Sequence, residues 1–296
     1  MPAADRKSDA LLSRRRHLGA ELRRLREQAG MSGRQLAEQI GVSQSKVSRI
    51  ESGASAPNIP EVTGWAAAVC ASEPAASRMI TLANAAYTEV DPWDVVMRGH
   101  ASLQGEIQEI ENGSRAVLVY EPTLVPGLLQ TAEYARRVFA MFDPAYAESD
   151  IPRLVAGRLD RQLAMYDPAR QFRFLITEAA LRWQPGPPDL MLAQLDRITS
   201  VSTLENVVMG VIPQSARALT HVPHGFVVME PADAGTDPLV LVETVHANLT
   251  MSDPGQVALY RRQWAQLEKT ATYGADARDL LSRIAASVRE LPGDGS

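Results

Sequence analysis

The stretch GRQLAEQIGVSQSKVSRIES, residues 33–52, decides the fold of the amino-terminal part of the chain. Its apolar positions predict two short helices that meet at a tight turn. Ala37 is small at the point where the helices would cross, and Gly41 occupies the turn, where a left-handed backbone costs little only for glycine. Ser43 is a favourable cap for the second helix. Val47 and Ile50 then close a small core, and together these features predict a helix-turn-helix.

The helix that starts at Ser43 carries polar side chains that this small core does not need. Gln44, Ser45 and Lys46 lie in its first turn, and Ser48 and Arg49 follow. In a helix-turn-helix this first turn enters the major groove, where glutamine can bind adenine and arginine or lysine can bind guanine or phosphate. We therefore expect Gln44, Ser45 and Lys46 at base edges, and Ser48 and Arg49 at bases or phosphates. The alternative is an ordinary helical hairpin with a solvated polar face.

Three further helices are predicted around this pair. Leu18, Leu22 and Leu25 follow helical spacing from Ser13 onward, and Gly30 ends that helix. Residues 61–71, which include Cys70 as an expected core residue, and residues 73–87 provide the other two. Residues 1–12 are polar without a periodic pattern and predict a flexible arm. The sequence thus predicts an all-α, five-helix domain over residues 13–88.

These residues resemble the Cro and phage-repressor type of helix-turn-helix, also called the xenobiotic-response-element type. The matching segments are Leu25-Arg26-Glu27, Gly30-Met31-Ser32, Leu36-Ala37 and the run from Gly41 to Gly53, followed by Pro57. The resemblance implies an ion pair between Arg26 and Glu51 that holds the first helix to the one that reads DNA. The DNA-contacting set that we predict is Gln44, Ser45, Lys46, Ser48, Arg49, Arg34 and Ser43.

The match departs from the family at Gly33. Many members have glutamine there, where it contacts DNA and supports the reading helix, whereas this chain has glycine followed by Arg34. We expect Arg34 to replace the phosphate contact. Arg14, Arg15 and Arg16 are further candidates for backbone contacts, and a solvated basic face is the alternative.

Charge is distributed unevenly along the 296 residues. The formal net charge is −5, but residues 1–88 hold 12 Lys and Arg against 8 Asp and Glu, and the remainder holds 18 against 27. A basic amino-terminal part on an acidic body is typical of a protein that contacts phosphate at one end only.

The rest of the chain, residues 89–296, predicts a larger α+β domain. Residues 95–111 are expected to form a helix that ends at Asn112-Gly113. Short β-branched or aromatic runs at 116–120, 172–177, 206–212, 225–230 and 239–243 predict strands, and amphipathic helices are expected near 131–142, 152–166, 189–200 and after Asp253-Pro254.

This part is similar to actinomycete regulators that carry the same helix-turn-helix and a second domain of unassigned function. The similarity lies in Tyr120-Glu121-Pro122, Val125 to Thr131, Tyr134-Ala135-Arg136, Arg158 to Gln162, Thr177 to Arg182, Gly225-Phe226 and Val242-Glu243. Members of that family are often encoded beside a small partner protein, and some are described as antitoxin-like. The resemblance therefore implies either a transcriptional regulator or an antitoxin-like module that binds a small neighbouring protein and regulates its own operon.

No enzyme activity, cofactor or metal is predicted, and an enzyme domain fused to the DNA-binding domain is the less favoured alternative. The chain has no Gly-x-Ser-x-Gly elbow, phosphate loop or dinucleotide-binding glycine pattern. His221 and His224, with Glu230 and Glu243, form the one constellation that could bind a metal, but the histidines lie in an expected loop and lack a helical metal-ligand motif. Glu178, Arg182 and Glu243 lie at strand ends, where surface ion pairs are the expected role.

The overall organisation predicts a cytoplasmic homodimer that binds double-stranded DNA. One recognition helix contacts too few base pairs for selectivity, whereas a two-fold pair reads two half-sites about 34 Å apart. No stretch has the roughly 18 uncharged apolar residues that a membrane helix requires, and the polar amino terminus does not predict a signal peptide.

Overall fold

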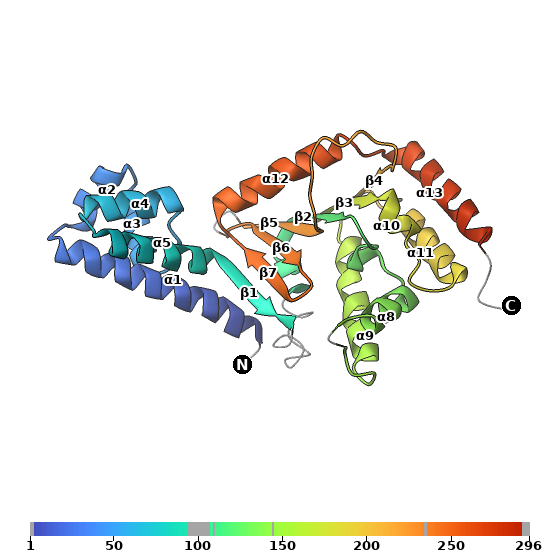
Figure 1. Ribbon diagram of the computed structural model, residues 1–296, viewed down its shortest axis with the longest axis horizontal. Helices are drawn as coiled ribbons and strands as arrows, with labels where there is room; N and C mark the ends of the chain where they lie inside the picture. Colours follow the sequence, from blue (N-terminus) through green and yellow to red (C-terminus); the bar gives the residue numbers. More distant parts are fainter. Residues whose placement is uncertain (1–2, 94–106, 109, 144, 234–235, 292–296) are drawn as a thin grey trace. The chain divides into compact units, whose positions relative to one another are not determined.

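The computed structural model describes residues 3–93, 107–108, 110–143, 145–233 and 236–291 (Figure 1). The chain forms two compact units. The first consists of Met1–Val90 with the returning segment Thr250–Gln256, and the second of Asp91–Leu249 with Val257–Ser296. Among the described residues, none of the helices combines the length and apolar character that crossing a bilayer requires.

The first unit is built from five helices, as the sequence predicts. They are α1 (Ala3–Gln28), α2 (Gly33–Ile40), α3 (Gln44–Glu51), α4 (Ile59–Ala68) and α5 (Glu73–Tyr87). Trp65 of α4 lies in the centre of the core and is fully buried, together with Leu22, Leu36 and Val62. The indole N–H of Trp65 donates a hydrogen bond to the carbonyl of Leu22 at 3.2 Å, so α1 and α4 are joined by a polar contact inside an apolar core.

Two features of this unit differ from the prediction. The first helix begins at Ala3, within the segment for which the polar sequence predicts a flexible arm. Cys70 is exposed and does not lie in the core. The reason is that α4 ends at Ala68, and Cys70 follows in the left-handed conformation with φ of +50°. Its N–H bonds to Ala67 and that of Ala71 to Ala66, which is a Schellman termination that turns the Cys70 side chain away from the apolar face.

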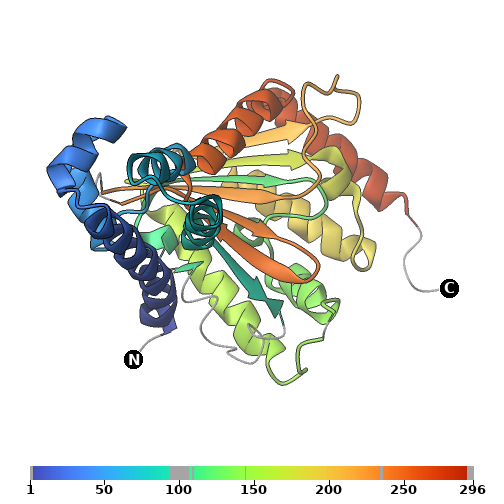
Figure 2. The same ribbon diagram turned by 60° about the vertical axis from the view of Figure 1, so that its left-hand side comes forward.

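The second unit is an α+β domain whose strands form one mixed sheet (Figure 2). The strands are β1 (Thr88–Pro92), β2 (Ser114–Glu121), β3 (Gln171–Thr177), β4 (Val207–Ile212), β5 (Phe226–Pro231), β6 (Leu239–Glu243) and β7 (Ala247–Met251), in the spatial order β1-β7-β6-β5-β2-β3-β4. The strands β2, β3 and β4 are parallel, and β5 pairs antiparallel with both β2 and β6. The predicted strands all form; β1 and β7 are additional, and each extends across the boundary between the two units.

Helices cover both faces of this sheet. They are α8 (Ala132–Ala140), α9 (Ile151–Gln162), α10 (Glu178–Arg182), α11 (Pro188–Val201), α12 (Pro254–Glu268) and α13 (Gly274–Arg289), with short 3-10 turns at Gly127–Leu129 and Leu163–Tyr166. Alternate residues of β2, β3 and β4 pack with α8, α11 and α13 in the larger core. Arg173, on the opposite face of β3, forms an ion pair with Glu268 of α12, so α12 covers the other side (Figure 1). Most of the helix predicted over residues 95–111 lies outside the described residues.

Candidate DNA interface

The turn between α2 and α3 is fixed by caps at both helix starts. Ser32 accepts the N–H of Gln35, whose side chain accepts the N–H of Ser32 in return, which completes a capping box. Gly41 ends α2 with φ of +70°, a conformation that glycine adopts without strain. Ser43 then begins α3 and accepts the N–H of Lys46 at 3.1 Å. Local sequence therefore sets the angle at which α3 leaves the turn.

The exposed side of α3 carries the side chains that the sequence predicts for DNA contact. Gln44, Ser45, Ser48 and Arg49 are all exposed, and so is the cap Ser43. Val47 and Ile50 on the same helix are each only 1% exposed. Arg34 is also exposed, at the start of α2, where it pairs with Glu38 at 3.2 Å. The amphipathic division of α3 thus leaves one continuous polar face in solvent.

Lys46 is the exception within the predicted set. Its ammonium group forms an ion pair with Glu61, in the first turn of α4, and the side chain is 33% exposed. The same Glu61 carboxylate accepts the N–H of Asn58 in the capping box that begins α4. Lys46 therefore holds α3 to α4, and its charge is partly neutralised before any ligand binds. Sequence spacing did not indicate this contact, because the two residues are brought together only by the fold.

The proposed pair between Arg26 and Glu51 forms a nearly buried, two-point contact. The Nε and Nη2 atoms of Arg26 donate to the two carboxylate oxygens of Glu51 at 2.5 and 3.0 Å. Each side chain is 10% exposed, and Nη1 also donates to the carbonyl of Met31 at 2.6 Å. The hydrogen bond to Glu51 raises the pKa of Arg26 above its ordinary value. One guanidinium thus connects α1, the chain before α2 and the end of α3.

Gly19 makes possible a close approach of α1 to α3 that the sequence analysis did not anticipate. A Cβ atom at Gly19 would lie 2.4 Å from the carbonyl oxygen of Ile50 and 2.8 Å from that of Glu51. Both atoms belong to the backbone and cannot move away as a side chain could. The signal in the sequence is a glycine beside the apolar stripe of Leu18 and Leu22. Gly33, by contrast, has room for a side chain, because its Cβ would make only ordinary contact with Val47 at 3.7 Å.

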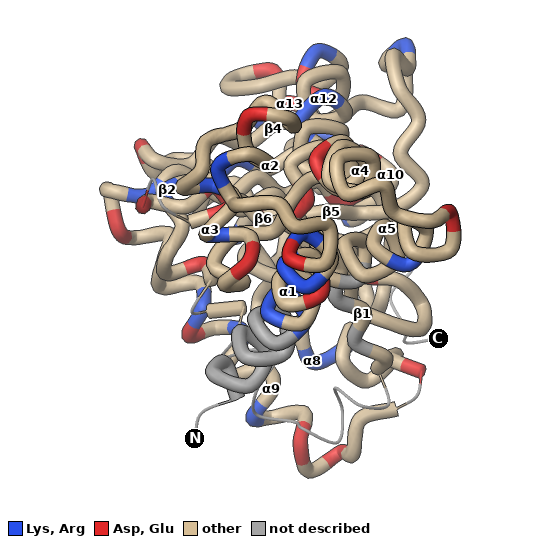
Figure 3. The backbone as a smooth tube through the Cα atoms, turned by 90° about the vertical axis from the view of Figure 1, so that its left-hand side faces the viewer, with Lys and Arg blue, Asp and Glu red and all other residues tan. Residues whose placement is uncertain are grey.

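Basic and acidic residues alternate along the described part of α1 (Figure 3), and most of its cations have contacts within the first unit. Arg23 pairs with Glu27 at 2.8 Å, and Arg24 pairs with Glu21 at 2.7 Å. Three consecutive arginines of α1 are predicted candidates for phosphate contacts. Arg14 donates to the carbonyl of Thr88 and Arg15 to the Ser252 hydroxyl, whereas Arg16 is exposed. Within the part of the chain that the structure describes, Arg49 of α3 has no ion-pair partner and is available for a ligand.

In the second unit, two of the residues considered for a metal site have other partners. Glu230 is bound by Arg261 at 2.5 Å, and the Nδ1 atom of His224 faces the carbonyl of Gly225. Among the described residues, no three His, Cys, Asp or Glu side chains are grouped to hold a metal ion.

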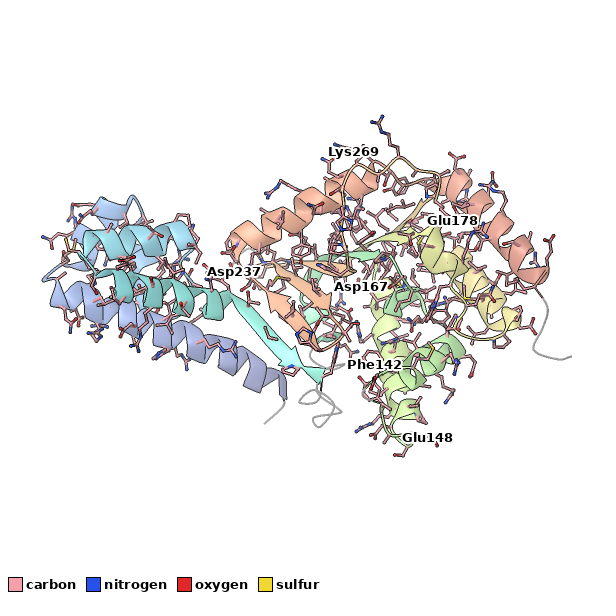
Figure 4. The ribbon with its side chains drawn as sticks, in the orientation of Figure 1. Phe142, Glu148, Asp167, Glu178, Asp237 and Lys269 are labelled. Atoms are coloured by element: carbon pink, nitrogen blue, oxygen red, sulfur yellow. The ribbon has the colours of Figure 1, made fainter. Side chains whose placement is uncertain are left out.

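Glu178 and Arg182 form the ion pair expected of them, at 2.8 Å. Glu178 lies at the start of α10 (Figure 4). Its other oxygen accepts the N–H of Gln214 at 2.9 Å, which holds the pKa of Glu178 below its ordinary value. Both residues line an open cavity of about 770 Å³ together with Asp276 and Arg283. The lining carries charges of both signs, and Glu178 and Arg182 already pair with each other, so the cavity does not by itself indicate a ligand.

The capped α2–turn–α3 unit with its exposed polar face defines the chain as a helix-turn-helix protein, and residues 17–79 match the family model described as a helix-turn-helix domain. Residues 104–283 match the model described as a domain of unknown function, DUF5753. Because this match covers more than half of the sequence, the chain belongs to the DUF5753 family. No curated protein matches the chain.

Proposed function

We propose that the protein is a sequence-specific transcriptional regulator that reads DNA through Gln44, Ser45, Ser48 and Arg49 of α3. The observation that carries this proposal is the exposed polar face of α3. The turn beside it is fixed by helix caps and by core packing. The available amide of Gln44 and guanidinium of Arg49 match the hydrogen-bonding edges of adenine and guanine in the major groove. Lys46 takes a secondary role in this proposal because Glu61 already neutralises part of its charge.

The second unit would supply dimerisation and the sensing of an effector or partner. A single α3 contacts only a few base pairs, so selectivity requires a second copy on a neighbouring half-site. We propose a homodimer that acts in the cytoplasm and has a binding role, not a catalytic one.

The test is the double variant Gln44→Ala/Arg49→Ala. We expect its affinity for duplex DNA to fall about 30-fold, because each lost base contact costs about 1 kcal/mol or more. The probe is an oligonucleotide enriched from random duplex DNA by the wild-type protein, and affinity is measured by fluorescence anisotropy at two salt concentrations.

The matched control is Gln28→Ala/Arg78→Ala, which removes the same chemical groups from exposed positions on α1 and α5. Its affinity should stay within twofold of wild type. Equal affinities of wild type and the Gln44→Ala/Arg49→Ala variant, or a failure of random DNA to yield any enriched sequence, would refute the proposal.

A second variant, Glu61→Gln, tests the role of Lys46. Glutamine keeps the capping box of α4 while it removes the charge that neutralises Lys46. We expect DNA affinity to rise about threefold to tenfold at low salt, with a steeper dependence on salt, because one more cation becomes available to phosphate. A lower affinity for this variant would mean that Lys46 serves DNA binding only by holding α3 to α4.

A further inference from the structure

Two acidic residues and a glycine stand in one row across three neighbouring strands of the second unit. Tyr120 is opposite Phe226 in the β2–β5 pair, which places Glu121 opposite Gly225. Val227 is opposite Leu241 in the β5–β6 pair, which places Gly225 opposite Glu243. Directly opposite residues of antiparallel strands share one face of a sheet. Glu121 and the exposed Glu243 therefore flank a position that has no side chain.

The absent side chain at Gly225 gives the Glu121 carboxyl its place. A Cβ atom at Gly225 would lie 2.7 Å from Oε2 of Glu121, so any other residue there would displace the carboxyl group. Glu121 also follows Val117 and Val119 on the strand face that packs against the larger core. The row thus faces the helices of that layer, where α9 contributes an arginine.

Arg158 of α9 is near enough to this row for its charge to act on Glu121, and part of its hydrogen-bonding capacity is unused. Its Nη1 donates to the side-chain oxygen of Gln130 at 2.5 Å, and its guanidinium lies 4.1 Å from the centre of the Phe139 ring. The guanidinium lies against Gly127, where a Cβ atom would make ordinary contact with Nε at 3.5 Å. That Nε atom is buried and has no hydrogen-bond partner among the described residues. Buried groups of this kind are normally satisfied, so an unpartnered one calls for a ligand or water.

Burial and neighbouring charges shift the pKa values of Glu121 and Arg158. Burial, reinforced by the charge of Glu243 and opposed by Arg158, raises the pKa of Glu121 to about 8. Burial and the neighbouring Arg161 lower the pKa of Arg158 to about 10, against the attraction of Glu243 and Glu121. Tyr134 of α8 also faces Glu121. Burial thus disfavours the charged forms of both Glu121 and Arg158.

From this geometry we propose that Glu121, Glu243 and Arg158 form a binding site for a small zwitterion of the α-amino-acid class. The ligand's ammonium group would donate to the carboxyl groups of Glu121 and Glu243, and its carboxylate would accept from the unpartnered Nε of Arg158. A simple anion would give the two carboxyl groups no donor, and a simple cation would give Nε of Arg158 no acceptor. This site would give the sensing role proposed above its class of ligand. Only an effect of that ligand on DNA binding rests on the proposed regulator function.

The site also accounts for sequence segments that DNA binding does not use. Glu121, Gln130, Arg158, Gly225 and Glu243 each fall in a segment that carries the similarity of the second domain to other regulators. Together they span more than a hundred residues of the chain.

The experiment uses the full-length protein and each of the twenty common L-amino acids as a separate probe. We expect at least one amino acid to raise Tm and to bind in isothermal titration calorimetry. Glu121→Gln and Arg158→Met should each weaken that binding at least tenfold. The control, Glu133→Gln/Arg136→Met, alters an exposed acid and base on α8 and should bind as wild type does.

The number of protons released on binding distinguishes direct contact between the ligand and Glu121 from an indirect structural effect of the substitutions. At pH 7 Glu121 is mostly protonated, so an ammonium group bound against it should drive release of roughly one proton. Titrations in phosphate and Tris buffers measure this release, and Glu121→Gln should abolish it. If no amino acid binds, or if Glu121→Gln binds with the same affinity and proton release, the site is refuted. DNA affinity, measured on the same preparations without amino acid, tests the regulator function separately.

Discussion

Gly19→Ala is expected to destabilise the first unit by about 3 kcal/mol, a large effect for the addition of one methyl group. The new Cβ would lie 2.4 Å from the carbonyl oxygen of Ile50, so α1 and the end of α3 would have to separate. That movement would also strain the contact between Arg26 and Glu51. Urea unfolding measures the loss of stability, and hydrogen exchange should show faster exchange of the α3 amides.

The control for this prediction is Gly64→Ala, in the middle of α4. A Cβ atom there would make ordinary contact with Ile40 at 3.6 Å, and alanine is favoured over glycine in a helix by about 1 kcal/mol. The same substitution should therefore stabilise the protein at position 64 and destabilise it at position 19. Equal effects at both positions would show that α1 and α3 do not approach as closely as the structure places them.

The sequence predicts a feature well when the residues that determine it lie close together in the chain. The cap Ser43, the turn glycine Gly41 and the buried positions Val47 and Ile50 all act within about ten residues of one another, and the structure has each in its predicted conformation or environment. The strands of the second unit were also predictable, because their β-branched runs are bounded by turn residues. The weaker signals of β1 and β7 were missed, since both are short and interrupted by polar residues.

What the sequence could not indicate is which distant residues meet. Lys46 has the charge and position of a base-contacting residue, and only the packing of α4 shows that Glu61 binds it. Cys70 continues an apolar run, yet the helix stops two residues earlier and leaves it exposed. The row of Glu121, Gly225 and Glu243 depends on strand register, which no local pattern encodes.

The ion pair between Arg26 and Glu51 leads to the second large effect. Arg26→Met should destabilise the first unit by about 3 kcal/mol, because it leaves the Glu51 carboxylate, 10% exposed, without a counter-charge. It also removes the donor to the Met31 carbonyl. The resemblance to phage-type repressors indicates the ion pair, but the large loss of stability expected on its disruption follows from its burial.

A double-mutant cycle separates this explanation from a simple loss of packing. Glu51→Met alone should also destabilise, since it leaves the guanidinium of Arg26 uncompensated, whereas Arg26→Met/Glu51→Met removes both charges from a nearly buried site. The double variant should therefore be more stable than the sum of the single effects predicts, by at least 1 kcal/mol in urea unfolding. Its DNA affinity should still fall, because the two-point contact that orients the end of α3 against α1 is lost. Strictly additive losses of stability would mean that the two side chains act independently, and that α3 is positioned by the close approach at Gly19 alone.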